Sequence, residues 1–598
     1  MKVNFTTLKS LLSPLGVTLY NLLIVYVVYF SARLIYFLEN YSYFSQNLSF
    51  SHVLEMLRGG LVFDTSAILV TNIPYIVLML FPLHYKETAA YQKLCRAVFL
   101  VINGLALAVN LCDAVYFRFT MRRTTTTVFD EFANEQNLGD VFLTETLRHF
   151  YLLVLFVVIL WAMYRLYRMT GLKYKTLTWW HYDLATLLSL AALAPFVVAG
   201  IRGGFVTAVR PITISNANQY VDRPVEAALV LNTPFSLYRT IGKAVFVVPE
   251  YFQSEAEMEK YFTPVHVPAD SLPMTKKNVV VFIVESFGRE YIGALNHTLD
   301  NSRYKGYTPH VDSLIARSIT FSHSYCNGRK SIDGMPSILS SIPMFVEPFF
   351  LTPASMNHVS GIASLLADEG YQTAFFHGAQ RGSMGFQAFA RSTGFQDYYG
   401  REDYDADSRF GGDADFDGMW AIWDEPFLQY YCAKMSEMKE PFMTAVFTAS
   451  SHHPYVIPEK YKDVYPEEGL VIHKCIRYTD MAIGRFFQQA SRQPWFKNTI
   501  FVLTSDHTNQ SDHMEYQTDL GGFCSPIVIY EPGVTDRNPE MQQKIAQQID
   551  ILPTLMGRLH YPKPYFAFGI DVLNTPAEDT WAVNYMNGIY QYVKHGHV

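Results

Sequence analysis

The 598-residue chain has little charge and little cysteine. Only 17% of its residues are Asp, Glu, Lys or Arg, and the formal net charge is −7. Nucleic-acid-binding proteins carry a basic excess, so this balance argues against that class. The six cysteines show no C-x-x-C spacing, which argues against a cysteine zinc site and leaves one or two disulfides open. The sequence contains no internal repeats and no low-complexity segments.

Long apolar runs fill the first third of the chain. Half of all residues are hydrophobic, which is unusual for a soluble enzyme of this size. A bilayer is crossed by roughly 20 apolar residues, and we expect five spans, near 12–38, 60–83, 97–117, 150–167 and 184–201. One such run could be a buried core helix, but five in succession favour a membrane domain. The first run is too long for a signal peptide and lacks a small-residue cleavage site after it.

Basic residues in the loops predict the topology of these spans. Loops rich in Lys and Arg face the cytoplasm, so five spans with the N-terminus inside place the C-terminal part outside the cytoplasm. The span at 60–83 contains Asp64, and because a bare charge is costly there, we expect it to meet a partner helix or the interface. The basic residues before span one, between spans two and three, and between spans four and five are Lys2, Lys9, Lys86, Lys93, Arg96, Arg165, Arg168, Lys173 and Lys175.

Three parts are expected along the chain. Residues 1–203 form the membrane domain, and 204–277 form amphipathic juxtamembrane helices followed by a linker. In residues 278–598, apolar strands alternate with helices. This is the βαβ pattern of a mainly parallel sheet covered by helices.

Polar residues follow four of the predicted strands. Glu285 follows "VVVFIV", His377 follows "TAFF", "SSHH" follows "TAVFTA", and Asp506 and His507 follow "TIFVLTS". One such residue is usually solvated or satisfied in the core, but four clusters at the carboxyl edge of one sheet indicate a site. Glu285, Asp506 and His507 together offer oxygen and nitrogen ligands suited to Mn²⁺ or Zn²⁺.

The stretch "CNGRKSIDGMPSILSSIP" places Ser331 near a predicted helix start, after Arg329 and Lys330. Backbone N–H groups, the helix dipole and two cations favour an anionic substrate there. With a metal bound, Ser331 could act as an alkoxide nucleophile. The alternative is that Ser331 only caps the helix, the commonest role of serine at such a place.

The motifs "VVVFIVESFGRE", "NGRKSIDGMPSILSSIP", "FTASSHHPY", "TSDHT" and "IDILPTLM" resemble the alkaline phosphatase/sulfatase superfamily in order and spacing. With the spans ahead of them, the chain resembles the lipoteichoic acid synthase and phosphoglycerol transferase branch. That resemblance implies a sulfatase-like (alkaline phosphatase-like) α/β domain carried outside a bacterial cytoplasmic membrane by a five-helix transmembrane domain.

The resemblance also implies a site. A divalent metal, most often Mn²⁺, with Zn²⁺ or Mg²⁺ as alternatives, is held by Glu285, Ser331, Asp506 and His507. Ser331 is the nucleophile, and His452 in "HHPY" contacts the substrate phosphate. The further substrate-binding candidates are Arg329, Lys330, His377 and Arg381.

The implied reaction moves a phosphoglycerol or related phospho-alcohol group. A membrane phospholipid is the donor, Ser331 carries the phosphoryl group as an intermediate, and a cell-envelope glycan or glycolipid is the acceptor. The sequence departs from the branch in having Ser331 where its members have Thr, and Met384 and Phe386 where they carry an aromatic residue and an Arg. A phosphoethanolamine transferase, a phosphatase or phosphodiesterase, and a scaffold with an inactive site therefore remain alternatives. A sulfatase is disfavoured because "SIDGM" does not offer its C/S-x-P-x-R motif.

Overall fold

A computed structural model describes residues 13–45, 48–81, 86, 88–120, 123–126, 128–129, 143, 145–170, 179–204, 211–242, 250–268, 272–586 and 589–598. Several basic residues of the predicted loops, Lys2, Lys9, Lys173 and Lys175, lie outside these ranges. The chain divides into two compact units, Met1–Lys243 and Ala244–Val598.

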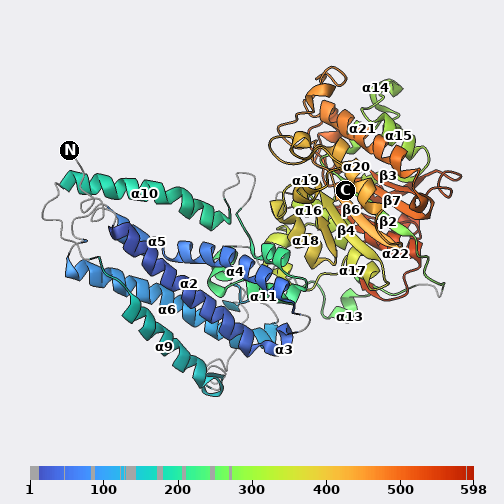
Figure 1. Ribbon diagram of the computed structural model, residues 1–598. Helices are drawn as coiled ribbons and strands as arrows, with labels where there is room; N and C mark the ends of the chain where they lie inside the picture. Colours follow the sequence, from blue (N-terminus) through green and yellow to red (C-terminus); the bar gives the residue numbers. More distant parts are fainter. Residues whose placement is uncertain are drawn as a thin grey trace. The chain divides into compact units, whose positions relative to one another are not determined.

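The first unit is helical (Figure 1). Helix α2 packs against α4, α5 and α6, and α6 packs against α9. The segment after α10 folds back as short helices against α4 and α6. The described helices of this unit are α2 Ser13–Glu39, α3 Tyr41–Phe44, α4 Phe50–Thr71, α5 Ile73–Leu80, α6 Ala89–Thr120, α9 Phe150–Leu166, α10 Trp179–Arg202, α11 Ala227–Val230 and α12 Thr233–Thr240, with 3₁₀ turns at Ile214–Tyr220 and Pro224–Glu226.

The expectation of five spans is not confirmed. Among the described residues, three helical segments are long and apolar enough to cross a membrane: Ser13–Glu39, Ala89–Arg118 and Asp183–Arg202. A fourth span arises only if α4 and α5 count as one, and these are bent by 60° where Asn72 separates them and Pro74 follows. Helix α9 has 17 residues, about 25 Å at 1.5 Å per residue, which is short for a full crossing.

Asp64 lies on the buried side of α4 and meets a partner helix, as expected. Its carboxylate accepts hydrogen bonds from both terminal nitrogens of Arg33 on α2, at 2.5 and 2.7 Å. The remaining Arg33 donors reach the Leu229 and Val230 carbonyl oxygens. Gly60 gives the guanidinium room, since a Cβ there would lie 2.8 Å from Arg33 Cζ. The pair therefore ties α2 and α4 to the segment that carries α11.

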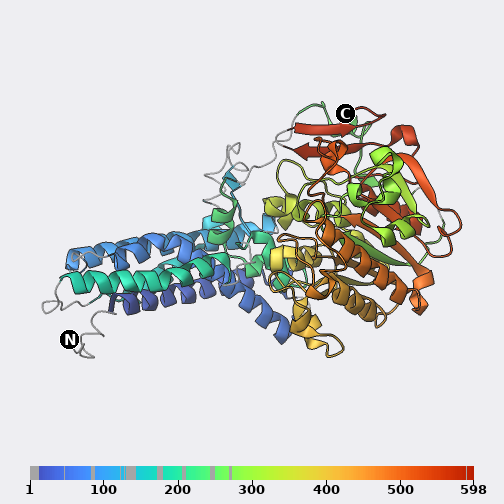
Figure 2. The ribbon, with the colours of Figure 1, turned by 90° about the horizontal axis from the view of Figure 1, so that it is seen from above.

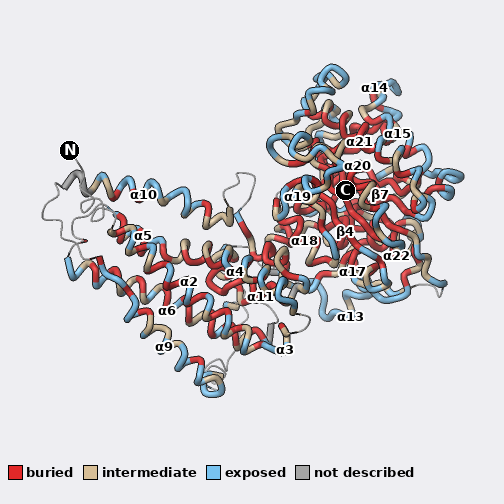
Figure 3. The backbone as a smooth tube through the Cα atoms, viewed as in Figure 1, coloured by how far each residue is buried: buried red, intermediate tan, exposed pale blue. Residues whose placement is uncertain are grey.

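The outward faces of these helices are apolar. Figure 3 shows long exposed stretches on α9 and α10. On α9 the exposed side chains include Leu153, Val154, Val157 and Trp161. Water would not favour so much continuous apolar surface, so these faces suit contact with lipid.

Figure 2 shows the second unit in the colours from green to red. It is built on one eight-stranded sheet in the order β5-β4-β6-β2-β7-β8-β3-β9. Every neighbouring pair is parallel except the two that involve β8, which is antiparallel to β7 and to β3. The sheet is therefore mixed, although most of it is parallel as expected. Its strands are β2 Asn278–Val284, β3 Ile319–Tyr325, β4 Gln372–His377, β5 Asp397–Tyr399, β6 Phe442–Phe447, β7 Thr499–Ser505, β8 Ile527–Tyr530 and β9 Glu540–Gln547.

Helices cover both faces of this sheet, which explains why β2 is apolar at every position from Val279 to Val284. Val279, Val281 and Ile283 pack with α16–α18 and α22, whereas Val280 and Phe282 pack with α15, α20 and α21. The covering helices are α15 Pro309–Ile315, α16 Ser331–Ser340, α17 Ile362–Ala367, α18 Phe386–Ser392, α20 Asp424–Met435, α21 His473–Ala490 and α22 Ile551–Leu559.

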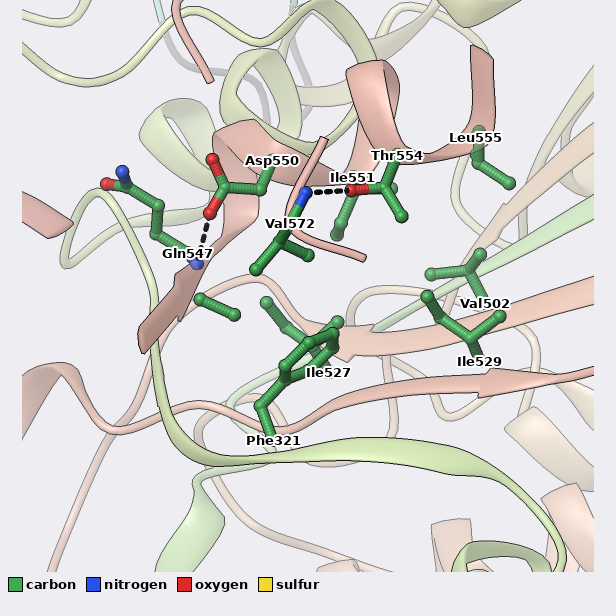
Figure 4. A pocket seen from close by; sticks show the side chains of 11 residues that line it. Phe321, Val502, Ile527, Ile529, Gln547, Asp550, Ile551, Thr554, Leu555 and Val572 are labelled. Atoms are coloured by element: carbon green, nitrogen blue, oxygen red, sulfur yellow. Dashed lines mark hydrogen bonds between the residues drawn. The ribbon is translucent and has the colours of Figure 1, made fainter. Parts of the chain in front are cut away.

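The remaining elements are short, and the core beneath α22 is apolar. Figure 4 shows Phe321, Val502 and Ile527 from three strands facing Ile551 and Leu555 of α22 around a small apolar cavity.

All six cysteines are described and are free thiols. The short elements are α13 Glu255–Met258, α14 Leu299–Ser302, α19 Arg401–Ala406, the strand pair β1 Val265–His266 with β10 Tyr565–Phe566, and the hairpin β11 Ala582–Met586 with β12 Ile589–Val593.

Candidate active site

The register of two central strands brings the predicted metal ligands together. Strands β2 and β7 are parallel neighbours with Val284 opposite Ser505. The next residues, Glu285 on one strand and Asp506 with His507 on the other, therefore leave the same edge side by side. Their ligand atoms all lie within 4.8 Å of one another.

Hydrogen bonds leave specific atoms of this cluster free. Asp506 Oδ1 accepts from the Ser286 and His507 backbone N–H groups, both at 2.8 Å, whereas Oδ2 is buried with no hydrogen-bond partner in the described structure. His507 Nδ1 lies 2.7 Å from the Thr508 carbonyl oxygen, to which an Nδ1–H donates. That tautomer leaves the Nε2 lone pair directed at Asp506 Oδ2, 3.2 Å away, and Glu285 Oε1, 3.6 Å away.

These residues fit a divalent cation. Burial and the charge of Glu285 raise the pKa of Asp506 to about 7, the usual result when two carboxylates share a dry site. Burial lowers the pKa of His507, but Asp506 and Glu285 outweigh it and the net shift is upward. A buried unpartnered carboxylate oxygen, a second carboxylate and an imidazole nitrogen are the ligand types that manganese and zinc accept.

Ser331 is the first residue of α16 and faces this cluster. Its Oγ lies 3.3 Å from Glu285 Oε2 and donates to it. The helix N-cap is Lys330, so Ser331 does not cap α16, contrary to the alternative reading of the sequence. Gly334 brings the helix close, because a Cβ there would lie only 2.3 Å from the Asp506 carbonyl oxygen. The close packing of α16 on the Asp506 backbone therefore places the Ser331 hydroxyl beside the ligands.

The loop after β6 supports Glu285 from the other side. Thr448 Oγ1 accepts from the Glu285 N–H at 3.0 Å, and Ser451 Oγ donates to the Glu285 carbonyl oxygen at 2.5 Å. His452 follows Ser451 directly. Its ring is half-buried and lies against the Trp420 ring, with centroids 4.8 Å apart. Ser451, the residue directly before His452, thus ties this loop to the Glu285 backbone.

The other predicted substrate-binding residues differ in their surroundings. Arg329 is half-buried over the Phe523 ring, in space that Gly522 leaves open, and no described residue forms an ion pair with it. Lys330 is exposed. His377 is buried with Nδ1 3.0 Å from the Phe447 carbonyl oxygen, and burial lowers its pKa to about 4, so the ring is neutral. The Arg381 guanidinium is bonded to Asp403 at 2.6 Å.

Sequence reasoning missed several residues of the site. Trp420 precedes α20 by four positions and lies 32 positions before His452, so no local pattern connects them. Asp424 at the start of α20 accepts from the Ala449 N–H and the Thr479 hydroxyl, both at 2.8 Å, and so shapes the loop that leads to His452. Phe386 is buried against His377 and Phe447. It stands at one of the two positions where the lipoteichoic acid synthase branch carries an aromatic residue and an Arg.

The chain is similar in sequence to known proteins. The Sulfatase family profile matches residues 277–561. A lipoteichoic acid synthase-like protein, YvgJ of Bacillus subtilis, is 23% identical over 390 residues, which are 60% of this chain and 61% of the relative. Phosphoglycerol transferase I of Escherichia fergusonii is 27% identical over 256 residues, 40% of this chain and 32% of the relative. The chain thus spans less than two thirds of the length of either relative.

Solved structures are similar over about half of the chain. An alkaline phosphatase superfamily protein from Vibrio parahaemolyticus has a TM-score of 0.47 at 25% identity, covering 54% of this chain and 77% of that one. The lipoteichoic acid synthase LtaP from Listeria monocytogenes has a TM-score of 0.43 at 21% identity, covering 52% and 79%. In sequence, the chain is thus similar to the Sulfatase family over residues 277–561, which are just under half of its length.

Proposed function

We propose that this protein is a membrane-anchored, metal-dependent phosphotransferase that moves the phosphoglycerol head group of a phospholipid to a cell-envelope glycan or glycolipid. The observation that carries the proposal is the Ser331 hydroxyl, 3.3 Å from Glu285, beside a three-residue cluster in which Asp506 Oδ2 has no hydrogen-bond partner among the described residues. The names of the curated relatives support the same class of reaction.

Glu285, Asp506 and His507 would hold the cation together with Ser331, and Mn²⁺ suits this set of ligands. A bound cation supplies charge that favours the alkoxide form of a serine hydroxyl and offsets negative charge on a phosphoryl group. Ser331 Oγ then attacks phosphorus of the donor, and the bond to diacylglycerol breaks as the diacylglycerol oxygen takes up a proton. An acceptor hydroxyl next attacks the phospho-serine, loses its own proton, and regenerates Ser331.

The surrounding residues bind and orient the donor in this proposal. Arg329, half-buried without a described ion-pair partner, and exposed Lys330 attract the phosphate. His452 donates to a phosphate oxygen, and neutral His377 lines the same edge of the sheet. The hydrogen bonds from Arg381 to Asp403 favour a role for Arg381 in shaping its loop.

Trp420 is the aromatic surface that we assign to the head group. Its indole N–H donates to the His453 carbonyl oxygen at 2.8 Å, and its ring lies against His452. Asp417 Oδ1 accepts from the Trp420 backbone N–H at 2.7 Å, so hydrogen bonds fix both the backbone and the indole ring of Trp420. A rigid, half-buried tryptophan suits the C–H face of glycerol, and it suits the ammonium of ethanolamine by cation–π attraction. Phosphoethanolamine transfer is therefore the second candidate.

The apolar N-terminal helices fit anchoring in a bacterial cytoplasmic membrane, with the domain at 278–598 outside the cytoplasm. This arrangement gives the site access to a phospholipid donor. The boundaries that we propose for the membrane domain and the juxtamembrane segment remain 1–203 and 204–277.

The test is release of diacylglycerol from labelled phospholipid by the purified full-length protein. We expect release from phosphatidylglycerol with manganese present and none after chelation. Preference for phosphatidylethanolamine would favour the second candidate, and free phosphate without acceptor would indicate a phosphatase. A phosphodiesterase would release the phosphorylated head group in free form instead.

Two substitutions test the roles of the residues. Ser331→Ala should abolish turnover while manganese still binds, and Asp506→Asn should lose both. The matched control is Ser337→Ala on the same helix, where the hydroxyl donates to the Asp333 and Ile342 carbonyl oxygens. An active Ser331→Ala enzyme, or unchanged metal content in Asp506→Asn, would contradict the proposal.

A further inference from the structure

A continuous set of hydrogen bonds joins the loop that carries His452 to both acidic ligands. Ser286 stands at its centre. Its Oγ donates to Glu285 Oε1 at 2.6 Å, and its backbone N–H donates to Asp506 Oδ1 at 2.8 Å. Ser286, the residue directly after Glu285, therefore fixes one oxygen of each carboxylate.

Asn509 extends the set outward. Its Nδ2 donates to Ser286 Oγ at 3.0 Å, and its Oδ1 accepts from the Tyr455 hydroxyl at 3.2 Å. Tyr455 belongs to the "HHPY" stretch, and its N–H donates to the His452 carbonyl oxygen at 3.1 Å. The path from His452 to Glu285 thus runs through Tyr455, Asn509 and Ser286.

Backbone strain marks both ends of this path. Ser286 has φ +55° and Tyr455 has φ +60°, in the left-handed region that residues other than glycine rarely occupy. Such conformations cost of the order of 1–3 kcal/mol each and persist where the surrounding contacts determine them. Ser286 is also completely buried, so the hydroxyl cannot exchange these partners for bulk water. The backbone preference of serine and tyrosine does not favour these conformations, so the surrounding contacts hold both residues in place.

We propose that Ser286 and Asn509 are positioning residues that hold Glu285 and Asp506 in place for the metal, and that Tyr455 makes metal affinity depend on phosphate bound at His452. The proposal rests on the metal site of the proposed function. Residues that orient metal ligands by hydrogen bonding typically contribute about 10- to 100-fold to metal affinity. If phosphate at His452 draws the loop into one position, it strengthens the bond to Asn509, and the metal must then strengthen phosphate binding by the same factor.

The experiment measures manganese binding by the full-length, metal-stripped protein in detergent, using the spectroscopic signal of free Mn²⁺. Titrations run with and without inorganic phosphate, each against a protein-free blank. Asn509→Leu, which keeps the size of the side chain but removes both hydrogen bonds, should weaken manganese binding about 10- to 100-fold. Tyr455→Phe should leave manganese affinity within a few-fold of wild type without phosphate, but should abolish the increase that phosphate causes in wild type.

The matched control is Tyr461→Phe, which removes a hydroxyl that donates to Glu425 at 2.8 Å in the same segment, away from Asn509. It should retain wild-type manganese affinity and the wild-type response to phosphate. If Asn509→Leu does not fold, Ser286→Ala serves instead, because it loses the Oγ bond to Glu285 but keeps the N–H bond to Asp506. Asn509→Gln keeps the side-chain amide. If it binds manganese more tightly than Asn509→Leu, the hydrogen bonds of residue 509, and not its size, support manganese binding.

The results separate this inference from the proposed function. Wild-type protein that binds no manganese would overturn both. Tight manganese binding by wild type, Asn509→Leu and Ser286→Ala alike would overturn the positioning role only. A wild-type manganese affinity that phosphate does not change, or a response to phosphate that survives in Tyr455→Phe, would overturn the coupling through Tyr455.

Discussion

Adding one methyl group at Gly334 should separate the nucleophile from the metal ligands. Gly334 lies on α16, three residues after Ser331, and a Cβ there would lie 2.3 Å from the Asp506 carbonyl oxygen. Ordinary contact begins at 3.4 Å, so Gly334→Ala must move the helix and the Asp506 backbone apart by about 1 Å. The three atoms nearest to the added Cβ are the carbonyl oxygen, carbonyl carbon and Cα of Asp506, all of them backbone atoms in a buried site, and none can turn aside as a flexible side chain would.

Two effects on stability oppose each other in Gly334→Ala. Alanine is favoured over glycine inside a helix by about 1 kcal/mol. Overpacking of a close-packed interior costs about 1–3 kcal/mol, and here the clash is with backbone, so we expect net destabilisation. A displacement of about 1 Å at reacting groups can cost about 100-fold in rate, so the loss of turnover should exceed the loss of stability.

The assays are thermal unfolding and diacylglycerol release by the same preparation. Gly288→Ala is the matched control, since Gly288 lies near Glu285 but a Cβ there meets its nearest neighbour at 3.7 Å, and φ is −59°. We expect the control to keep most of its activity. Wild-type turnover in Gly334→Ala would refute the reasoning that close packing of α16 on Asp506 positions Ser331.

Three further predictions follow from the described contacts. Because burial and Glu285 raise the pKa of Asp506 to about 7, protons compete with the metal, and manganese affinity should fall about tenfold per pH unit below about pH 7. In metal-free protein, the raised pKa of Asp506 increases the free energy of unfolding below the unfolded pKa of Asp506, and this stabilisation is lost as the pH rises through about 7. The melting temperature of chelated protein should therefore fall over that range of pH. Trp420→Ala should raise KM for the lipid donor more than it lowers kcat, whereas Trp420→Phe should retain most of the affinity. Arg33→Met leaves Asp64 buried without its charge partner and should lower stability in detergent by about 3–5 kcal/mol.

Each of these has a result that would count against it. A manganese affinity independent of pH would mean that Asp506 holds no proton at the site. Equal KM values for wild type and Trp420→Ala would remove the indole from the donor site. In the first unit, the double substitution Arg33→Met with Asp64→Leu should lower stability less than Arg33→Met alone, because no charge is left unpaired. A double variant as unstable as the single one would show that packing, and not charge pairing, is lost.

Local patterns in the sequence determined much of the catalytic domain. Apolar runs such as Val279–Val284 are long enough to be buried strands, and an acid or an Asp-His pair directly after such a run must emerge at the carboxyl edge of the sheet. That logic needs no tertiary information, since strand ends in a parallel sheet share one edge. It predicted the cluster of Glu285, Asp506 and His507 that lies within 4.8 Å, and the resemblance of the motifs added Ser331.

The sequence was less informative about the helical first unit, Met1–Lys243. Hydropathy alone predicts five spans but does not show that the chain bends by 60° between α4 and α5, or that α9 stops after 17 residues. Composition cannot distinguish a broken helix from a straight one. Asp64 illustrates the same limit, because its cost in the membrane predicts a partner but does not name Arg33.

Contacts between segments far apart in sequence were decided by the tertiary structure alone. The order of the strands makes β2 and β7 neighbours and gives β8 the opposite direction, and the close approach of Gly334 to Asp506 sets where Ser331 points. Trp420 beside His452, and Asn509 between Tyr455 and Ser286, depend on loops meeting across the sheet edge. Periodicity and spacing record what one segment buries, whereas which segments meet depends on how all the strands and helices pack at once.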